Sequence, residues 1–173
     1  MEKGLIHIYC GDGKGKTTAA VGLCVRAAGH GKRVVFVQFL KSESSGERSV
    51  LRMLPQIVVF PCPHSTKFTF QMTEEEKREE ARACSSRLCA AWKEAEKADM
   101  LVLDEVFGAL SAGLLSEGEV LTGLRKKPKG LEVVLTGRDP AHFFLEIADY
   151  VTQMKKQKHP YESGTGARKG IEY

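Results

Sequence analysis

A glycine- and lysine-rich segment near the start of the chain contains the residue types that bind a chain of phosphates. It reads Gly11-Asp12-Gly13-Lys14-Gly15-Lys16-Thr17-Thr18, between a short apolar run and a helical pattern. Glycines let consecutive backbone N–H groups turn toward an anion, and the N-terminus of the following helix adds donors and the positive end of its dipole. Lys16 supplies a mobile cation for the phosphates, and the Thr17 hydroxyl can ligate Mg²⁺.

The spacing of this segment departs from the usual phosphate-loop (P-loop) pattern GxxxxGK[ST]. The first glycine of that pattern would fall on Cys10, and Gly11 and Gly15 enclose only three residues. We therefore interpret the segment as a variant P-loop in which Gly13 supplies the missing flexibility. The alternative interpretation is a glycine-rich turn that precedes a basic helix.

An acidic pair later in the chain is the expected partner of this loop. Asp104 and Glu105 directly follow the apolar run 100–103, which has the pattern of a buried strand. P-loop proteins hold Mg²⁺ with a P-loop hydroxyl and with a carboxylate at the end of such a strand. The predicted metal ligands are therefore Thr17, Asp104 and Glu105, and Lys16, Thr17 and Glu105 are the predicted catalytic residues. These residues predict a Mg–nucleoside triphosphate site and leave the reaction open.

Short apolar runs alternate with helical patterns along the chain, and this alternation predicts how the site is positioned. Alternating strands and helices favour βαβ units around a parallel sheet, so we expect an α/β, three-layer, P-loop NTPase-like fold. Residues 41–49 are polar and rich in Ser and Glu, and we predict a loop there. The predicted strands span residues 5–9, 33–39, 57–60, 100–103, 131–135 and 150–152, and the predicted helices span 17–30, 73–97, 106–112, 117–126 and 141–148.

Length and composition fit one globular domain. The chain has 173 residues, of which 42% are hydrophobic and 28% charged, so we expect a single domain over 1–173. No apolar run approaches the roughly 20 residues of a membrane span, and no secretory signal leads the chain, so we expect a cytoplasmic protein. The five cysteines contain no CxxC pair, and we expect all five to be reduced and buried or half-buried.

Most of the net charge of +4 lies in the last nineteen residues. Residues 155–173 contain five basic and two acidic side chains, which gives +3. This basic tail is either a solvated segment or one that meets an anion.

Four further segments, together with the variant P-loop, resemble the P-loop-type corrinoid adenosyltransferases, which act on cob(I)alamin or cob(I)yrinic acid a,c-diamide. The resemblance extends over nearly the whole chain, in order, and the variant P-loop is itself a feature of that family. The segments are residues 26–41, Phe68-Thr69-Phe70, Leu135-Thr136-Gly137-Arg138, and residues 148–173.

The resemblance implies transfer of the 5′-deoxyadenosyl group of ATP to the Co(I) centre of a corrinoid, with release of triphosphate. ATP would be the co-substrate, the corrinoid the acceptor, and Mg²⁺ or Mn²⁺ the metal ion. Phe68 and Phe70 would lie against the corrinoid. Arg138 follows a predicted strand at the same edge of the sheet as the P-loop, so it either contacts the nucleotide or the corrinoid or forms a structural ion pair. The nucleotide contacts implied by the family motifs are Gly11, Asp12, Gly13, Lys14, Gly15, Lys16, Thr17, Thr18 and Arg26.

The resemblance also implies partners and exposes two departures. A flavoprotein reductase would supply electrons, and the enzyme would be a homodimer, with neither nucleic acid nor membrane as a partner. Family members often have an N-terminal extension that caps the site, whereas the first strand here begins near Gly4, so we expect the basic tail to cover the site. Family members also often have Trp where this chain has Phe70, which keeps the apolar bulk and loses the indole donor.

Two other function classes stay open at this point. A phosphotransferase or NTPase could use the same loop, and it would release ADP or phosphate instead of triphosphate. A non-enzymatic nucleotide-binding module that binds RNA through the basic tail would show a steep salt dependence of its affinity.

Overall fold

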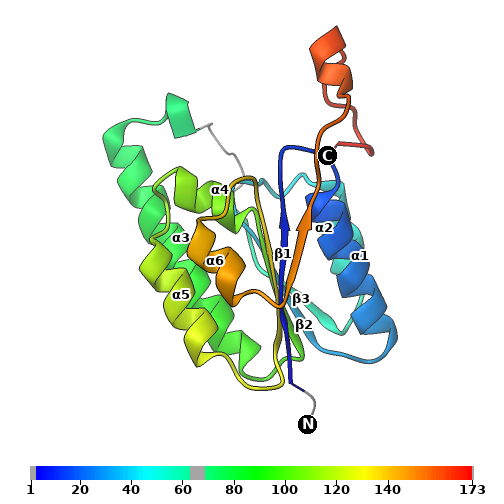
Figure 1. Cartoon of the computed structure of the whole chain (residues 1–173), viewed down its shortest axis with the longest axis vertical. Helices are drawn as coiled ribbons and strands as arrows, with labels where there is room; N and C mark the ends of the chain where they lie inside the picture. Colours follow the sequence, from blue (N-terminus) through cyan, green and yellow to red (C-terminus); the bar gives the residue numbers. More distant parts are fainter. Residues whose placement is uncertain (1–2, 63–68, 173) are drawn as a thin grey trace.

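The computed structural model, which describes residues 3–62 and 69–172, has a six-stranded parallel sheet with strand order β3-β2-β4-β5-β1-β6 (Figure 1). All five strand pairs are parallel, which confirms the predicted α/β architecture. The strands are β1 (Ile6–Cys10), β2 (Val34–Gln38), β3 (Ile57–Val59), β4 (Met100–Asp104), β5 (Glu132–Thr136) and β6 (Tyr150–Gln153).

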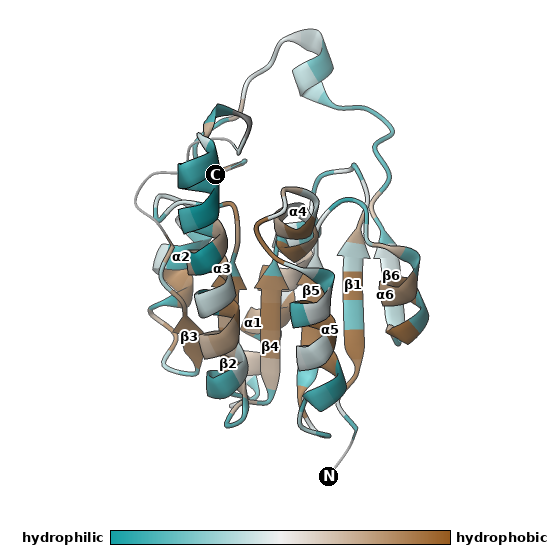
Figure 2. Ribbon diagram, turned by 90° about the vertical axis from the view of Figure 1, so that its left-hand side faces the viewer, coloured by the Kyte–Doolittle hydropathy of each residue, from teal (hydrophilic) through white to brown (hydrophobic). Residues whose placement is uncertain are grey.

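The central strands are apolar because both faces of the sheet are covered. Every residue of β2 and β4 is buried, and Figure 2 shows β4 as a hydrophobic strand behind helices with hydrophilic outer surfaces. A strand buried on both sides has no polar face, so its sequence is nearly continuous in Val, Leu and Phe. By contrast, β6 forms one edge of the sheet and all four of its residues are exposed.

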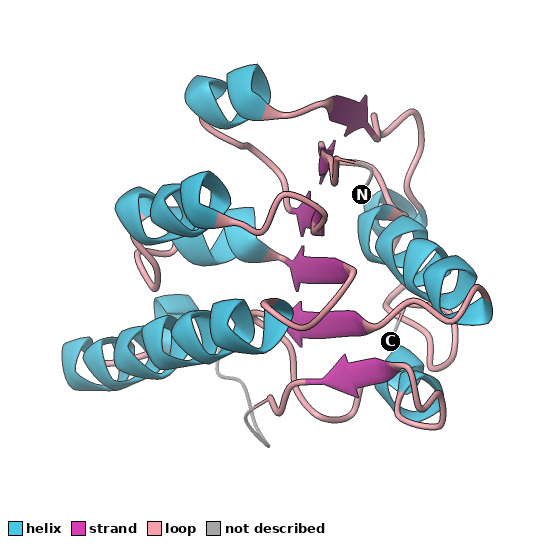
Figure 3. Cartoon of the chain, turned by 90° about the horizontal axis from the view of Figure 1, so that it is seen from below, coloured by secondary structure: helices cyan, strands magenta, loops and turns pink. Residues whose placement is uncertain are grey.

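Helices form a layer on each side of the sheet, as Figure 3 shows. One core cluster contains Ala20, Cys24 and Ala28 of α1 with Leu51 of α2, and the other contains buried residues of α3, α4, α5 and α6. The helices are α1 (Lys16–Gly29), α2 (Gly46–Leu51), α3 (Glu74–Ala95), α4 (Val106–Ser111), α5 (Glu117–Lys126) and α6 (His142–Ile147), with 3₁₀ turns η1 (Thr69–Gln71) and η2 (Pro160–Ser163). Three layers were predicted and are confirmed.

Local capping explains where two of the helices begin. The Thr73 hydroxyl accepts a hydrogen bond from the Glu76 N–H, and the Glu76 side chain accepts one from the Thr73 N–H. The sequence Thr73-Glu74-Glu75-Glu76 has the pattern of this capping box, which satisfies N–H groups that would otherwise lack partners in the first turn. Ser116 and Glu119 form a second capping box at the start of α5.

Two sequence predictions are wrong. Residues 41–49 are not all loop, because Gly46–Leu51 form α2, whose Arg48 is completely buried. The prediction that every cysteine is at least half-buried fails at Cys89, which is exposed on α3.

In the described part of the chain, no helix combines the length and the apolar character that a membrane span requires.

The parallel strands place several polar residues at one edge of the sheet. Strands β1, β2, β4 and β5 all point the same way, so their carboxyl ends lie together. That edge carries Gly11 after β1, Gln38 at the end of β2, Asp104 at the end of β4 and Thr136 at the end of β5. Ligand sites of open α/β sheets lie at this edge.

Candidate nucleotide-binding site

The variant P-loop has a backbone that requires its glycines. Gly11 and Gly15 have φ of 103° and 112°, which side chains rarely tolerate. The loop also lies against the chain that leaves β6, where the Gly13 N–H donates to the Met154 carbonyl at 2.7 Å. A Cβ at Gly11 or Gly13 would lie 2.5 or 2.7 Å from that carbonyl oxygen. The glycines therefore permit the turn and its close contact with residue 154.

The loop leads directly into α1, which begins at Lys16. Its N-cap is Gly15, which has no side chain to cap the first turn, so the helix offers N–H groups to an anion. Lys16 is only 8% exposed, and its Nζ donates to the Gly13 carbonyl at 2.9 Å. The ammonium group is thus folded back over the loop, where it can neutralise a phosphate.

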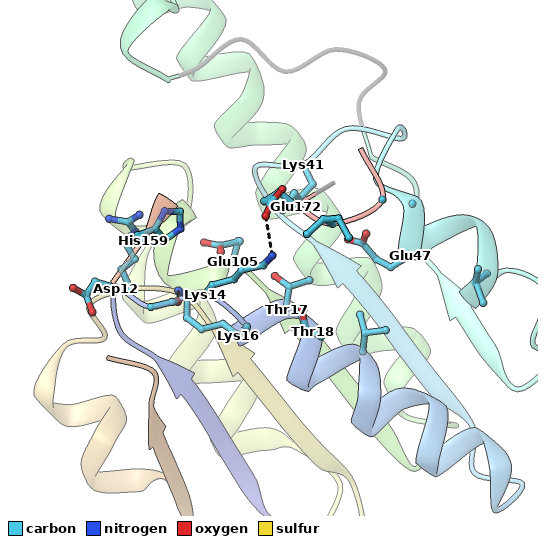
Figure 4. Close-up of a pocket in the computed structure, with 18 residues that line it drawn as sticks. Asp12, Lys14, Lys16, Thr17, Thr18, Lys41, Glu47, Glu105, His159 and Glu172 are labelled. Atoms are coloured by element: carbon cyan, nitrogen blue, oxygen red, sulfur yellow. Dashed lines mark hydrogen bonds and ion pairs between the residues drawn. The ribbon is translucent and has the colours of Figure 1, made fainter. Parts of the chain in front are cut away.

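A pocket of about 820 Å³ opens in front of this loop (Figure 4). Its volume suits a nucleotide-sized ligand. Residues from five parts of the chain line it: the P-loop with the first turns of α1, the segment around α2, the end of β4, the turn after β5, and the C-terminal tail. They are Asp12, Gly13, Lys14, Gly15, Lys16, Thr17, Thr18, Val21, Lys41, Gly46, Glu47, Val50, Glu105, Arg138, His159, Gly170, Ile171 and Glu172.

The two acidic residues occupy different depths. Asp104 is completely buried and is absent from the pocket lining, whereas Glu105 lines the pocket. The Thr17 hydroxyl donates to Asp104 Oδ2 at 3.2 Å, so Asp104 lies behind Thr17 as seen from the pocket. The acidic pair was predicted as two metal ligands, and the geometry separates it into a pocket-facing carboxylate and a buried acceptor that orients Thr17.

Two buried side chains hold Asp104 from the other directions. Thr136 donates to Asp104 Oδ1 at 2.7 Å, and Gln38 Nε2 donates to Oδ2 at 3.1 Å. Burial raises the pKa of Asp104, and these hydrogen bonds act against that rise. Neither Gln38 nor Thr136 was assigned a role from the sequence. Their polar character at the carboxyl ends of buried strands is the signal that could have identified them.

Glu105 has an unusual backbone. Its φ of 57° is one of two positive values at non-glycine residues in the described chain, the other being Leu40 at 56°. The Thr136 hydroxyl also accepts the Glu105 N–H at 2.8 Å, which holds this turn in place. Burial and the neighbouring Asp104 raise the pKa of Glu105, while Lys16 acts in the opposite direction. Backbone strain of this kind concentrates at functional sites.

The donor set fits Mg²⁺. Thr17 and Glu105 face the pocket with a hydroxyl and a carboxylate, which are the hard oxygen ligands that this ion prefers. In residues 3–62 and 69–172, no group of three or more His, Cys, Asp and Glu residues could hold a metal ion. Proteins usually bind Mg²⁺ through one or two carboxylates together with phosphates and water.

The C-terminal tail closes over the P-loop. Glu172 accepts a hydrogen bond from Lys14 Nζ at 3.0 Å, drawn as a dashed line in Figure 4. Asp12 accepts from the Lys156 N–H at 2.9 Å. Hydrogen bonds from Arg168 and Lys14 hold the pKa of Glu172 at about 2, so its carboxylate is ionised at neutral pH. The tail therefore adds an anion to the pocket, whereas none of the lysines and arginines in its described part, 155–172, lines it.

The remaining predicted residues fall into three groups. Arg138 lines the pocket. Arg26 is exposed in the last turn of α1 and is absent from the lining, about 13 Å along the helix from Thr17. Phe68 lies outside the described residues, and Phe70 belongs to η1, but its side chain is likewise outside the description.

The chain resembles one family along almost its whole length. A family model described as ATP:corrinoid adenosyltransferase BtuR/CobO/CobP matches residues 2–173. A corrinoid adenosyltransferase of Pseudomonas aeruginosa is 37% identical over 179 residues, which cover 99% of this chain and 85% of that one. The corrinoid adenosyltransferase CobA of Salmonella typhimurium is 34% identical over 180 residues, covering 99% of this chain and 87% of that one.

Among solved structures, the RadB recombinase is similar in fold. It superposes with a TM-score of 0.51 and 17% sequence identity, covering 92% of this chain and 78% of that one. At this identity the likeness concerns the fold, and it agrees with the P-loop NTPase-like architecture predicted from the sequence.

Proposed function

The chain belongs to the ATP:corrinoid adenosyltransferase family, and on that premise we propose how its own residues carry out the family's reaction. The enzyme transfers the 5′-deoxyadenosyl group of ATP to the cobalt of a corrinoid and releases triphosphate. An electron pair of Co(I) forms the Co–C bond to C5′, the C5′–O bond breaks, and its electron pair leaves on triphosphate. Cobalt is formally oxidised from Co(I) to Co(III).

This chemistry needs no general base, because Co(I) is already a strong nucleophile. The protein must instead place C5′ in line with the cobalt and stabilise the negative charge of the leaving group. The loop amides, the first turn of α1 and the Lys16 ammonium serve the second need. Mg²⁺ held by Thr17 and Glu105 would neutralise further charge on the phosphate oxygens. The observation that carries the proposal is that Lys16, Thr17 and Glu105 all line the same cavity.

The tail would cover the bound nucleotide. Its residues His159, Gly170, Ile171 and Glu172 line the cavity together with the P-loop. Lys14 would exchange the Glu172 carboxylate for a phosphate when ATP enters, so the tail adjusts as the nucleotide binds.

The family resemblance supplies the rest of the proposal. Phe68 and Phe70 would pack on the corrinoid and exclude water and its lower axial ligand, so that Co(II) is more easily reduced by a flavoprotein reductase. Replacing both by Ala should then impair the reductase-coupled reaction more than the reaction with chemically made Co(I), and equal losses in both would contradict this role. A homodimer and a cytoplasmic location belong to the same proposal.

The reaction itself is tested by product analysis. Incubation with ATP, Mg²⁺ and chemically reduced corrinoid should give a light-sensitive Co–C product, and Lys16→Ala should slow its formation by about 100-fold or more. Formation of ADP or phosphate without a Co–C bond would instead identify a phosphotransferase or NTPase.

A further inference from the structure

A completely buried arginine lies beside the nucleotide site. Arg48 of α2 has no exposed side-chain surface, and its guanidinium donates to Gln38 Oε1 at 3.0 Å, to Glu43 Oε1 at 2.9 Å and to the Phe60 carbonyl at 2.6 Å. Burying a charge is costly unless it is paired and hydrogen-bonded. A simple contact between α2 and the sheet could be made by an apolar side chain, so the charge suggests a more specific role.

Arg48 determines which way the Gln38 amide points. A guanidinium donates hydrogen bonds and cannot accept them, so it must face the amide oxygen of Gln38. The amide NH₂ then faces the opposite side, where it donates to Asp104 Oδ2 at 3.1 Å and to Glu47 Oε1 at 2.8 Å. If the amide were reversed, its NH₂ would face the Arg48 guanidinium, and its oxygen would face the carboxylates of Asp104 and Glu47. Donors would then face donors on one side, and acceptors would face acceptors on the other. Arg48 therefore makes Gln38 a donor toward Asp104.

The same carboxylate oxygen accepts a hydrogen bond from the Thr17 hydroxyl. Asp104 Oδ2 accepts from Thr17 Oγ1 at 3.2 Å. With its proton engaged behind the pocket, the hydroxyl oxygen of Thr17 presents its lone pairs to the cavity that it lines. This is the orientation that a cation ligand needs. A chain of directed hydrogen bonds thus runs from Arg48 through Gln38 and Asp104 to Thr17.

Glu43 anchors the Arg48 end of this series of hydrogen bonds. Glu43 accepts from Arg48, from Arg52 and from the Cys62 N–H at 2.6 Å. Partial burial alone would raise the pKa of Glu43, but these three donors hold it at about 2, so Glu43 stays ionised as the partner of Arg48. The guanidinium is therefore held between Glu43 and Gln38.

We propose that Arg48 is a positioning residue of the nucleotide site, acting through Gln38 and Asp104 on the Thr17 hydroxyl. The inference rests on the proposed function in one respect, namely that Thr17 is a ligand of the divalent cation. The competing explanation is that Arg48 only attaches α2 to the sheet.

The test separates cation binding from nucleotide binding. Mn²⁺ binding to the full-length protein with ATP is measured by electron paramagnetic resonance of the free ion, and ATP affinity is measured separately without metal. Arg48→Met and Gln38→Met should each weaken Mn²⁺ binding by about 10-fold or more, with ATP affinity changed less than about twofold. Arg48→Lys should recover part of the loss, because it restores a donor to Gln38. If Arg48→Met does not fold, Gln38→Met carries the test, since it leaves Arg48 paired with Glu43.

Two control variants make the outcomes distinguishable. Arg52→Met removes another donor to the same carboxylate, but Arg52 is 44% exposed and no hydrogen bond joins it to Gln38 in the described network, so Mn²⁺ binding should stay within about twofold. Thr17→Ala should abolish the Mn²⁺ site. Suppose that Thr17→Ala loses Mn²⁺ binding while folded Arg48→Met and Gln38→Met bind Mn²⁺ normally. That result would overturn the role of Arg48 and leave the proposed cation site intact. Normal Mn²⁺ binding in Thr17→Ala would overturn both the inference and the proposed cation site.

Discussion

Replacing Thr136 by Val tests whether a buried hydroxyl holds the acidic pair together. Val keeps the shape and strand preference of Thr but removes the hydroxyl that donates to Asp104 at 2.7 Å and accepts the Glu105 N–H at 2.8 Å. A hydrogen bond to a charged group is worth about 1.5–3 kcal/mol and a neutral one about 0.5–1.5 kcal/mol. Because the Asp104 carboxylate is completely buried and the Glu105 N–H partly so, we expect the free energy of unfolding to fall by about 2–4 kcal/mol.

Chemical and thermal unfolding measure this loss. For a chain of this size, about 2–4 °C of melting temperature correspond to 1 kcal/mol, so the melting temperature should fall by roughly 5–15 °C. Thr136→Ser is the matched control, since it keeps the hydroxyl and should cost only about 1 kcal/mol for the lost methyl group. The Ser variant should also retain the Mn²⁺ affinity that the Val variant loses.

The loss should depend on pH in a defined direction. Burial raises the pKa of Asp104 in the folded chain above its ordinary value of 3.8, so proton uptake favours the folded state as the pH falls. Without the Thr136 donor this pKa rises further, and the variant gains more from acidification than the parent does. The difference in free energy of unfolding between the parent and Thr136→Val should therefore shrink as the pH is lowered from 7 toward 4. A difference below about 0.5 kcal/mol at pH 7, or one that is constant with pH, would refute this account of Asp104.

Three further predictions concern packing, a thiol and the tail. In Gly123→Ala the new Cβ would lie 2.1 Å from the Trp92 ring, so the free energy of unfolding measured in urea should fall by about 1–3 kcal/mol. In the control Gly22→Ala the new Cβ meets nothing within 4 Å, and the free energy of unfolding should rise by about 0.5–1 kcal/mol. Equal effects of the two substitutions would contradict the packing argument. Iodoacetamide should label the native chain at Cys89 alone, because the other four thiols are buried, and peptide mass spectrometry would reveal any label elsewhere. Deleting residues 155–173 should weaken ATP binding and slow turnover, and unchanged values of both would show that the tail does not cover the site.

The parts of the fold that the sequence predicted are those decided by local patterns. Buried strands such as Val34–Gln38 are continuous apolar runs, and the helix Glu117–Lys126 has amphipathic spacing. The capping box at Thr73 involves residues three positions apart. By contrast, α2 has only six residues, and Gly and Ser within it are poor helix formers. It depends on the tertiary contacts of Arg48, which no local pattern records.

The candidate site divides in the same way. The P-loop and the acidic pair are contiguous motifs, so their residue types could be read directly. The complete burial of Asp104 behind Thr17 could not be predicted from the sequence. It depends on hydrogen bonds to Thr17, Gln38 and Thr136, which lie 87, 66 and 32 positions away in the chain. The sheet register pairs Gln38 with Asp104, and only that pairing makes Gln38 part of the site.

The P-loop of this chain serves alkyl transfer rather than phosphoryl transfer. The most direct test of this function is a single-turnover reaction without oxygen, in which the protein, Mg²⁺, ATP and chemically reduced corrinoid are mixed. The Co–C bond is followed by its light-sensitive visible spectrum and the phosphorus products by ³¹P nuclear magnetic resonance. We expect one intact triphosphate for each Co–C bond, with no ADP. ADP or free phosphate as the first product, or triphosphate released without a Co–C bond, would contradict alkyl transfer.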